Sequence, residues 1–351
     1  MKEFVYVGRP QRVVFGAGSL RHLQREIQAL GAKKALVLST PQQRASAARV
    51  ASLLGACAVG IFDRAVMHVP IETARDARQT ARSLGAECAV AIGGGSTIGL
   101  GKAIALDSGL PTLAIPTTYA GSEMTPIYGL TEGGVKKTGR DERVLPRTVI
   151  YDPELTTSLP AVMSLTSGIN AIAHAAEGLY SATTNPILDL MAQEGIAALG
   201  RSLPAIAAGL NRDDARSDAL YGAWLCGMVL AGVDMALHHK LCHTLGGTFN
   251  LPHAETHTIV LPHALAYNAP AVPLAMQRIA AAIGQSDAPS ALFDLAKDNG
   301  APVALEELGM VRADLEKACD LALQNRYPNP RPLEREPLMR LLEDAYEGRR
   351  P

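Results

Sequence analysis

The stretch CAVAIGGGSTIGLGK at residues 88–102 places a short apolar run directly before three glycines. The run Cys88–Ile92 lacks polar alternation, which is typical of a strand that is buried on both faces of a parallel sheet. Glycines directly after such a strand let the backbone turn sharply and approach a ligand closely. A helix that begins near Ser96 would point its free N–H groups at that ligand, an arrangement that suits a pyrophosphate.

The glycine spacing matches neither GxGxxG at the strand end nor a Walker A loop. A glycine turn with a purely structural role is therefore the alternative interpretation. The order of strand, glycines, serine and helix favours phosphate binding over that alternative. The residues of this loop that we expect to contact a dinucleotide are Gly93, Gly94, Gly95, Ser96 and Thr97.

Strands and helices are expected to alternate through the first part of the chain. The expected strands are Arg12–Phe15, Lys34–Leu38, Ala58–Phe62, Cys88–Ile92, Thr112–Ile115 and Arg147–Tyr151. The segments with helical spacing between them are Leu20–Leu30, Gln42–Leu54 and Thr73–Leu84. This order predicts a Rossmann-like α/β domain over residues 1–155, with a parallel sheet that binds ligands at the carboxyl ends of its strands.

Two other strand ends in this domain carry hydroxyl side chains. Thr117 and Thr118 follow the strand Thr112–Ile115, and they could hydrogen-bond a ribose or a pyrophosphate. Ser39 and Thr40 follow the strand Lys34–Leu38, where an acidic residue would reject a 2′-phosphate. Because Ser39 and Thr40 are neutral, we expect dinucleotides both with and without that phosphate to bind.

The pattern changes after Asp152, and long helical periods rich in Ala, Leu and Met follow. The expected helices are Ala161–Tyr180, Pro186–Ala208, Asp214–Val233, Pro273–Ile283, Ala288–Asn299, Arg312–Asn325 and Glu336–Tyr346. Pro252 and Pro262 are interpreted as breaks between helices. This pattern predicts an all-helical domain over residues 156–351.

Histidines are concentrated in the helical domain. Asn170 and His174 are four residues apart, as are His239 and His243, so each pair projects from one helix face. His253 follows in a Pro-His segment that we interpret as a loop. A single histidine on an apolar helix is usually a satisfied core residue, but this concentration indicates a metal or proton-transfer site.

Composition excludes several classes of protein. The 33 Lys and Arg residues balance 34 Asp and Glu residues, so no basic excess favours a nucleic-acid or anionic-membrane partner. No apolar run is long enough to cross a bilayer, and the N-terminus lacks a secretory signal, so we expect a cytoplasmic protein. Five widely spaced cysteines without a CxxC pair indicate neither disulfides nor a cysteine zinc site.

Together these motifs resemble the iron-containing alcohol dehydrogenase family, which shares its fold with dehydroquinate synthase-like proteins. The resemblance spans nearly the whole chain and includes the triglycine loop, the PTT loop, the GxNAxxHAxE helix and the HxxxH helix. An Asp and three His hold the metal in that family, and the corresponding residues here are Asn170, His174, His239 and His253. At two positions the sequence departs from the family pattern: Asn170 replaces the Asp ligand, and Gly99 stands where the pattern GGGSxxDxxK has Asp. In both departures the sequence resembles the branch of the family that reduces maleylacetate.

The resemblance to that branch implies NADH- or NADPH-dependent reduction of the C=C bond of 2-maleylacetate to 3-oxoadipate in aromatic degradation. It also implies a homodimer, and the missing Asp leads us to expect that metal is not required. The substrate would be a small dicarboxylate, so the site must stabilise an oxyanion, bind two carboxylates and supply a proton. The expected substrate-binding residues are Lys136 and Arg140 in a basic loop, Asn170 and Tyr119.

The expected catalytic residues are His243 and His253, with His174 and His239 in support. We expect the substrate dianion to keep an imidazolium protonated, which suits a donor to the enolate. Three other functions remain open at this point: a metal-dependent (Fe or Zn) alcohol dehydrogenase that acts on a small alcohol or aldehyde, a non-catalytic dinucleotide sensor, and a lyase of the dehydroquinate synthase type.

Overall fold

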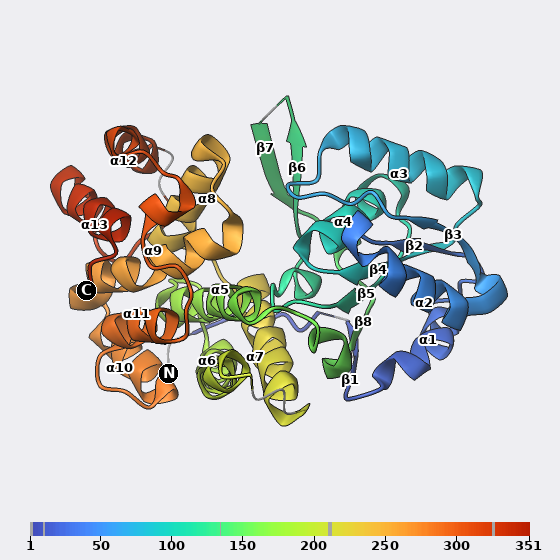
Figure 1. Cartoon of the computed structure of the whole chain (residues 1–351), viewed down its shortest axis with the longest axis horizontal. Helices are drawn as coiled ribbons and strands as arrows, with labels where there is room; N and C mark the ends of the chain where they lie inside the picture. Colours follow the sequence, from blue (N-terminus) through green and yellow to red (C-terminus); the bar gives the residue numbers. More distant parts are fainter. Residues whose placement is uncertain (1–2, 10, 134, 210–212, 325–326) are drawn as a thin grey trace. The chain divides into compact units, whose positions relative to one another are not determined.

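The computed structural model describes residues 3–9, 11–133, 135–209, 213–324 and 327–351 (Figure 1). The chain divides into two compact units, each described below by itself. One unit spans Gly8–Leu159, and the other contains Pro160–Pro351 together with the N-terminal segment up to Val7. The sequence predicts a division between residues 155 and 156, which lies close to the boundary between Leu159 and Pro160.

The Gly8–Leu159 unit is built on a six-stranded parallel sheet in the order β1-β8-β5-β4-β2-β3. Its strands are β1 (Arg12–Phe15), β2 (Ala35–Leu38), β3 (Ala58–Phe62), β4 (Cys88–Gly93), β5 (Thr112–Pro116) and β8 (Thr148–Tyr151). The expected parallel sheet is thus confirmed. The chain passes from β2 outward to β3 and then returns to the other side of β2, so the strand order reverses between β2 and β4. The carboxyl ends of these two strands are where such sheets bind ligands.

Helices cover both faces of this sheet, as Figure 1 shows. The helices are α1 (Leu23–Ala29), α2 (Arg44–Leu54), α3 (Ile71–Ser83) and α4 (Gly95–Ser108). Val37 and Val90 pack with α1 and α2, whereas their neighbours Leu36 and Ala89 pack with α3 and α4. Because successive strand residues point to opposite faces and both faces are buried, the strands are apolar throughout.

The segment after the PTT loop is a β-hairpin, so its interpretation as a basic loop is wrong. β6 (Ile127–Glu132) pairs antiparallel with β7 (Val135–Arg140), and Gly133 turns the chain with a φ of 57°. Two glycines between β-favouring runs are a hairpin signal that could have been read from the sequence. Arg140 is exposed at the end of β7. Lys136 lies on the same strand, but its side chain is outside the described part of the structure.

The other unit consists of helices and their connections, with no strand among its described residues. Its helices are α5 (Ala161–Tyr180), α6 (Pro186–Ala207), α7 (Asp213–Gly232), α8 (Leu237–Phe249), α9 (His253–Asn268), α10 (Pro273–Ile283), α11 (Ala288–Asp298), α12 (Leu315–Leu323) and α13 (Arg335–Glu347). The fold class expected from the sequence, an α/β unit followed by a helical one, is confirmed. Within the described ranges, no single helix is long and apolar enough to cross a membrane, although α7 and α8, bent by 96°, pass that test as a pair.

Helix α9 corrects two expectations. His253 is its first residue rather than part of a loop, and Pro262 lies inside it rather than at a break. Ile259 and Val260 are buried in a core that α9 shares with α8, α12 and α13. We attribute the intact helix to this packing, because burial of an apolar surface outweighs the local penalty of one proline.

Candidate active site

The triglycine turn joins β4 to α4 and leaves open space at the start of the helix. Gly93 has a φ of 151°, and a Cβ there would lie 2.6 Å from both Gln43 Oε1 and Thr97 Oγ1. Any other residue at position 93 is therefore strained. Gly95 is the first residue of α4 and is exposed, and a Cβ built there meets nothing within 4 Å. The helix N-terminus is thus open to an anion.

The two expected hydroxyl loops have different surroundings. Thr117 N donates to Gly93 O at 3.1 Å, and Thr117 Oγ1 accepts from Gln43 Nε2 at 2.8 Å. Thr118 lies against the turn, because its Cγ2 would be 3.0 Å from a Cβ at Gly94. Ser39 is fully buried, and its hydroxyl has no partner among the described residues. Gln43 was missed, since no sequence pattern marks it.

Replacing Gly95 with alanine separates ligand binding from folding. We expect Gly95→Ala to leave the folded state intact or stabilise it by about 0.5 kcal/mol, because the site is open and alanine favours a helix. The same methyl group should weaken NADH binding by about tenfold or more, because it occupies space that a pyrophosphate needs at the helix N-terminus. Fluorescence titration with NADH and thermal unfolding measure the two effects.

The control is Gly200→Ala on α6, where an added Cβ makes only ordinary contacts, the shortest at 3.7 Å. It should affect stability in the same direction and leave NADH binding unchanged. Unchanged NADH affinity in Gly95→Ala would show that the pyrophosphate binds elsewhere.

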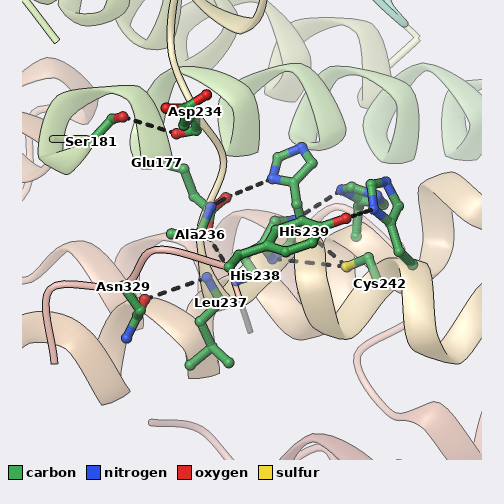
Figure 2. A network of polar contacts seen from close by, with 12 residues as sticks. Glu177, Ser181, Asp234, Ala236, Leu237, His238, His239, Cys242 and Asn329 are labelled. Atoms are coloured by element: carbon green, nitrogen blue, oxygen red, sulfur yellow. Dashed lines mark hydrogen bonds and ion pairs between the residues drawn. The ribbon is translucent and has the colours of Figure 1, made fainter. Parts of the chain in front are cut away.

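In the helical unit, a buried carboxylate organises the histidines (Figure 2). Glu177 lies on α5, one turn after His174, and its side chain is fully buried. Its Oε2 accepts from Ala236 N at 2.7 Å and from His239 Nδ1 at 2.8 Å, while Oε1 accepts from His238 N at 2.7 Å. Glu177 therefore caps the N-terminus of α8 and orients the His239 ring. This role was not expected from the sequence, although Glu177 stands within the GxNAxxHAxE motif.

The bond to Glu177 fixes the tautomer of His239. An ionised carboxylate only accepts, so the proton is assigned to Nδ1 and the lone pair to Nε2. His239 Nε2, His174 Nδ1 and Asn170 Oδ1 are all buried without a hydrogen-bond partner among the described residues. The rings of His174 and His239 are 5.2 Å apart between centroids. Unpaired buried polar atoms cost about 1–3 kcal/mol each, so this group is better explained as a ligand site than as core.

A second group of side chains lies next to the rings of His174 and His239. His238 Nε2 and His257 Nδ1 share a hydrogen bond of 2.9 Å, and Cys242 Sγ is 3.7 Å from His238 Nε2. The ligand atoms of these three residues lie within 4.8 Å of one another. The expectation that Cys242 is a small buried residue agrees with its exposure of 1%.

Burial determines the charge of the inner histidines. Desolvation, followed by neighbouring histidines, lowers the pKa of His174, His238 and His257 well below the usual 6.5. These three rings are therefore neutral at physiological pH in the substrate-free protein.

Two expected catalytic histidines are the accessible ones. His243 is exposed one turn after His239, and its Nδ1 is 2.9 Å from Tyr327 OH. His253 is half-buried at the start of α9, with its ring 4.2 Å from that of His257. Tyr327 was missed because nothing in the sequence links it to α8. Tyr119, expected at the substrate, is fully buried in the α/β unit.

The segment that carries Tyr327 is anchored by Asn329. Asn329 Oδ1 accepts from Leu237 N at 3.3 Å, and Asn329 and Asn268 exchange amide hydrogen bonds of 3.0 and 2.8 Å. Arg331 donates to Tyr267 O at 2.8 Å and stacks over that ring. The guanidinium group of Arg331 is thus engaged within the fold.

The donor atoms suit a metal only in part. Asn170, His174, His239 and His253 are the residues that would hold an ion, with the carboxylate of Glu177 behind His239 as in many metal sites. Three imidazoles can hold zinc, but the amide oxygen of Asn170 is neutral and weak. We expect this set to bind a divalent ion less tightly than one that includes a carboxylate.

Comparisons with known proteins agree with this architecture. Residues 10–153 match the iron-containing alcohol dehydrogenase family, and residues 164–346 match the Fe-containing alcohol dehydrogenase family, C-terminal. The chain is 66% identical to a maleylacetate reductase of Burkholderia cepacia over the full length of both. Crystal structures of maleylacetate reductases from Agrobacterium tumefaciens and Rhizobium sp. strain MTP-10005 cover 100% of both chains, with TM-scores of 0.97 and 0.96 at 52% and 51% identity. Because these family models cover both the triglycine turn and the histidine cluster, the chain belongs to the iron-containing alcohol dehydrogenase family.

Proposed function

We propose that this protein is a maleylacetate reductase, which uses NADH or NADPH to reduce the C=C bond of 2-maleylacetate to 3-oxoadipate. The observation that carries the proposal is the full-length similarity to enzymes of that name, joined to a site that has Asn170 in place of an acid. We expect a cytoplasmic homodimer that acts in the degradation of aromatic compounds.

The reaction divides between the two units. Hydride passes from the nicotinamide to the alkene carbon β to the ketone, the electron pair moves to the ketone oxygen as an enolate, and the α carbon takes a proton. The α/β unit binds the coenzyme at the glycine turn and the threonines beside it. The helical unit supplies hydrogen-bond donors and the proton, as oxyanion chemistry requires.

Within the helical unit, the roles follow from accessibility and tautomer. His239 presents a bare Nε2, so in its neutral form it accepts rather than donates there. His243 and His253 are more accessible, and a dianionic substrate beside them favours their protonated forms. They are therefore the proposed donors to the enolate and to the α carbon, while His174 and His239 shape the site.

Asn170 fits a dicarboxylate substrate for an electrostatic reason. An unpaired carboxylate at this buried position would repel a dianion, whereas the amide is neutral and can still hydrogen-bond. Lys136 and Arg140 on the hairpin are the proposed partners of the substrate carboxylates. A metal held by the imidazoles would act as a Lewis acid on the ketone oxygen, but we propose that turnover does not require one.

The decisive experiment mixes purified protein, maleylacetate and NADH and follows the loss of nicotinamide absorbance. We expect turnover that persists after exhaustive chelation, and turnover with NADPH as well. Failure to reduce maleylacetate would overturn the function. Activity that chelation abolishes and that only iron or zinc restores would overturn the metal-free mechanism alone.

A metal-dependent alcohol dehydrogenase is the second candidate. His174 Nδ1 and His239 Nε2 have no hydrogen-bond partner within the described ranges, and this favours the alternative because such atoms suit a metal ion. Oxidation of propanediol or butanol that depends on added metal, without activity on maleylacetate, would support this alternative.

A further inference from the structure

Lys102 is a buried cation to which the proposed reaction assigns no role. It lies on α4, two turns after Gly95, and its side chain is 1% exposed. Burial lowers the pKa of Lys102 to about 7, and the nearby Glu123 opposes that shift. An ammonium group this deep in a protein is unfavourable unless all its donors are satisfied.

The ammonium group of Lys102 makes three hydrogen bonds. Nζ donates to Ser122 O at 2.6 Å, to Ile127 O at 2.7 Å and to Thr125 Oγ1 at 3.0 Å. These acceptors occupy all three N–H groups. They belong to the turn that leads from the threonine loop into β6, of which Ile127 is the first residue. Lys102 therefore connects the helix that begins at the glycine turn to the base of the hairpin.

The pairing of β6 with β7 links the segment that Lys102 holds to Lys136 and Arg140. Ile127 pairs with Arg140, and Thr131 pairs with Lys136. Arg140 is the last residue of β7 and is exposed. Ile127, whose backbone carbonyl Lys102 holds, is thus paired directly with Arg140.

A second contact attaches the side of the hairpin to α4. Thr131 N donates to Val69 O at 3.1 Å, and Thr131 Oγ1 donates to His68 O at 2.8 Å. Val69 in turn packs on α4 so closely that a Cβ at Gly99 would lie 2.9 Å from Val69 Cγ2. The hairpin is therefore held against the same helix at two points, of which Lys102 is the charged one.

We propose that Lys102 is a positioning residue that holds β7, the strand of Lys136 and Arg140, in place relative to α4. The inference rests on the proposed function, which assigns the substrate carboxylates to Lys136 and Arg140. Without the ammonium group, the segment at the start of β6 loses three hydrogen bonds to α4. The strand β7, which is paired with β6, is then no longer held in place relative to the glycine turn. Misplaced binding groups weaken substrate capture before they affect the coenzyme.

The test compares Lys102→Met with Lys33→Met, which removes one exposed positive charge from the same unit. We expect Lys102→Met to raise the KM for maleylacetate by about tenfold or more, while the Kd for NADH changes by less than about threefold. Hydrogen exchange of amides in residues 127–140 should be about tenfold faster than in the wild type. Lys33→Met should change none of these quantities.

A folded Lys102→Met protein with unchanged KM and unchanged exchange in the hairpin would overturn the proposal. So would equal losses of NADH and maleylacetate affinity, because they would indicate a general structural role. If Lys102→Met does not fold, Thr125→Val tests the proposal instead, because it removes one acceptor of the Lys102 ammonium group. It should raise the KM for maleylacetate and the exchange rates in the hairpin by smaller amounts. If the wild type does not reduce maleylacetate, the proposed function fails, and the exchange data still test what Lys102 holds.

Discussion

Replacing His253 with alanine should lower kcat for maleylacetate reduction by about 10²–10⁴-fold, the usual effect of removing a general acid. The Kd for NADH should change by less than about threefold, because the residue lies on α9 in the helical unit and not at the glycine turn. His253 is half-buried, and its ring is 4.2 Å from the neutral His257. Steady-state kinetics and NADH fluorescence titration measure the two quantities.

A matched control is His22→Ala in the α/β unit, which should retain wild-type kinetics. If His253→Ala loses NADH affinity and keeps its turnover at saturating coenzyme, His253 belongs to coenzyme binding and the proton must come from another group. Unchanged kcat and KM would remove the residue from the site altogether.

Replacing Glu177 with glutamine should reduce the free energy of unfolding of the helical unit by about 3 kcal/mol. The carboxylate accepts from two backbone N–H groups and the His239 ring. A glutamine amide has one oxygen and one NH2 group, so at least one of these buried donors faces another donor. Loss of the fixed His239 tautomer should also lower kcat.

Urea unfolding followed by the fluorescence of Trp224 measures this stability, because the only tryptophan of the chain lies on α7 in the helical unit. The control is Glu194→Gln on α6, whose ion pair with Arg201 is about half exposed. It should change stability by less than about 0.5 kcal/mol. Equal stability of the Glu177 and Glu194 variants would contradict the capping role of Glu177.

The α/β unit was largely predictable because its signals are local. Strands buried on both faces leave continuous apolar runs, and the triglycine turn marks where one of them ends. The hairpin β6–β7 was missed, although the Gly133-Gly134 pair could have predicted it. The charged residues Lys136, Lys137 and Arg140 leave β7 without the apolar alternation that is typical of a strand.

The helical character of the second unit could be predicted from the sequence, but the contacts within its histidine cluster could not. Spacing brought His174 together with Asn170, and His239 with His243, because residues four apart share a helix face. The hydrogen bonds of His257 to His238 and of Glu177 to α8 could not be predicted this way, since these partners are distant in sequence. These hydrogen bonds depend on how α5, α8 and α9 pack.

The parallel strands, the glycine turn and the helices that carry His174 and His239 could be predicted from the amino-acid sequence, because backbone propensity and periodic burial are encoded within short segments. The folded structure was needed to show which histidines are neutral, which nitrogen of His239 carries the proton, and what Lys102 holds. Those properties depend on desolvation and on hydrogen bonds between residues far apart in the chain, and no local pattern specifies either.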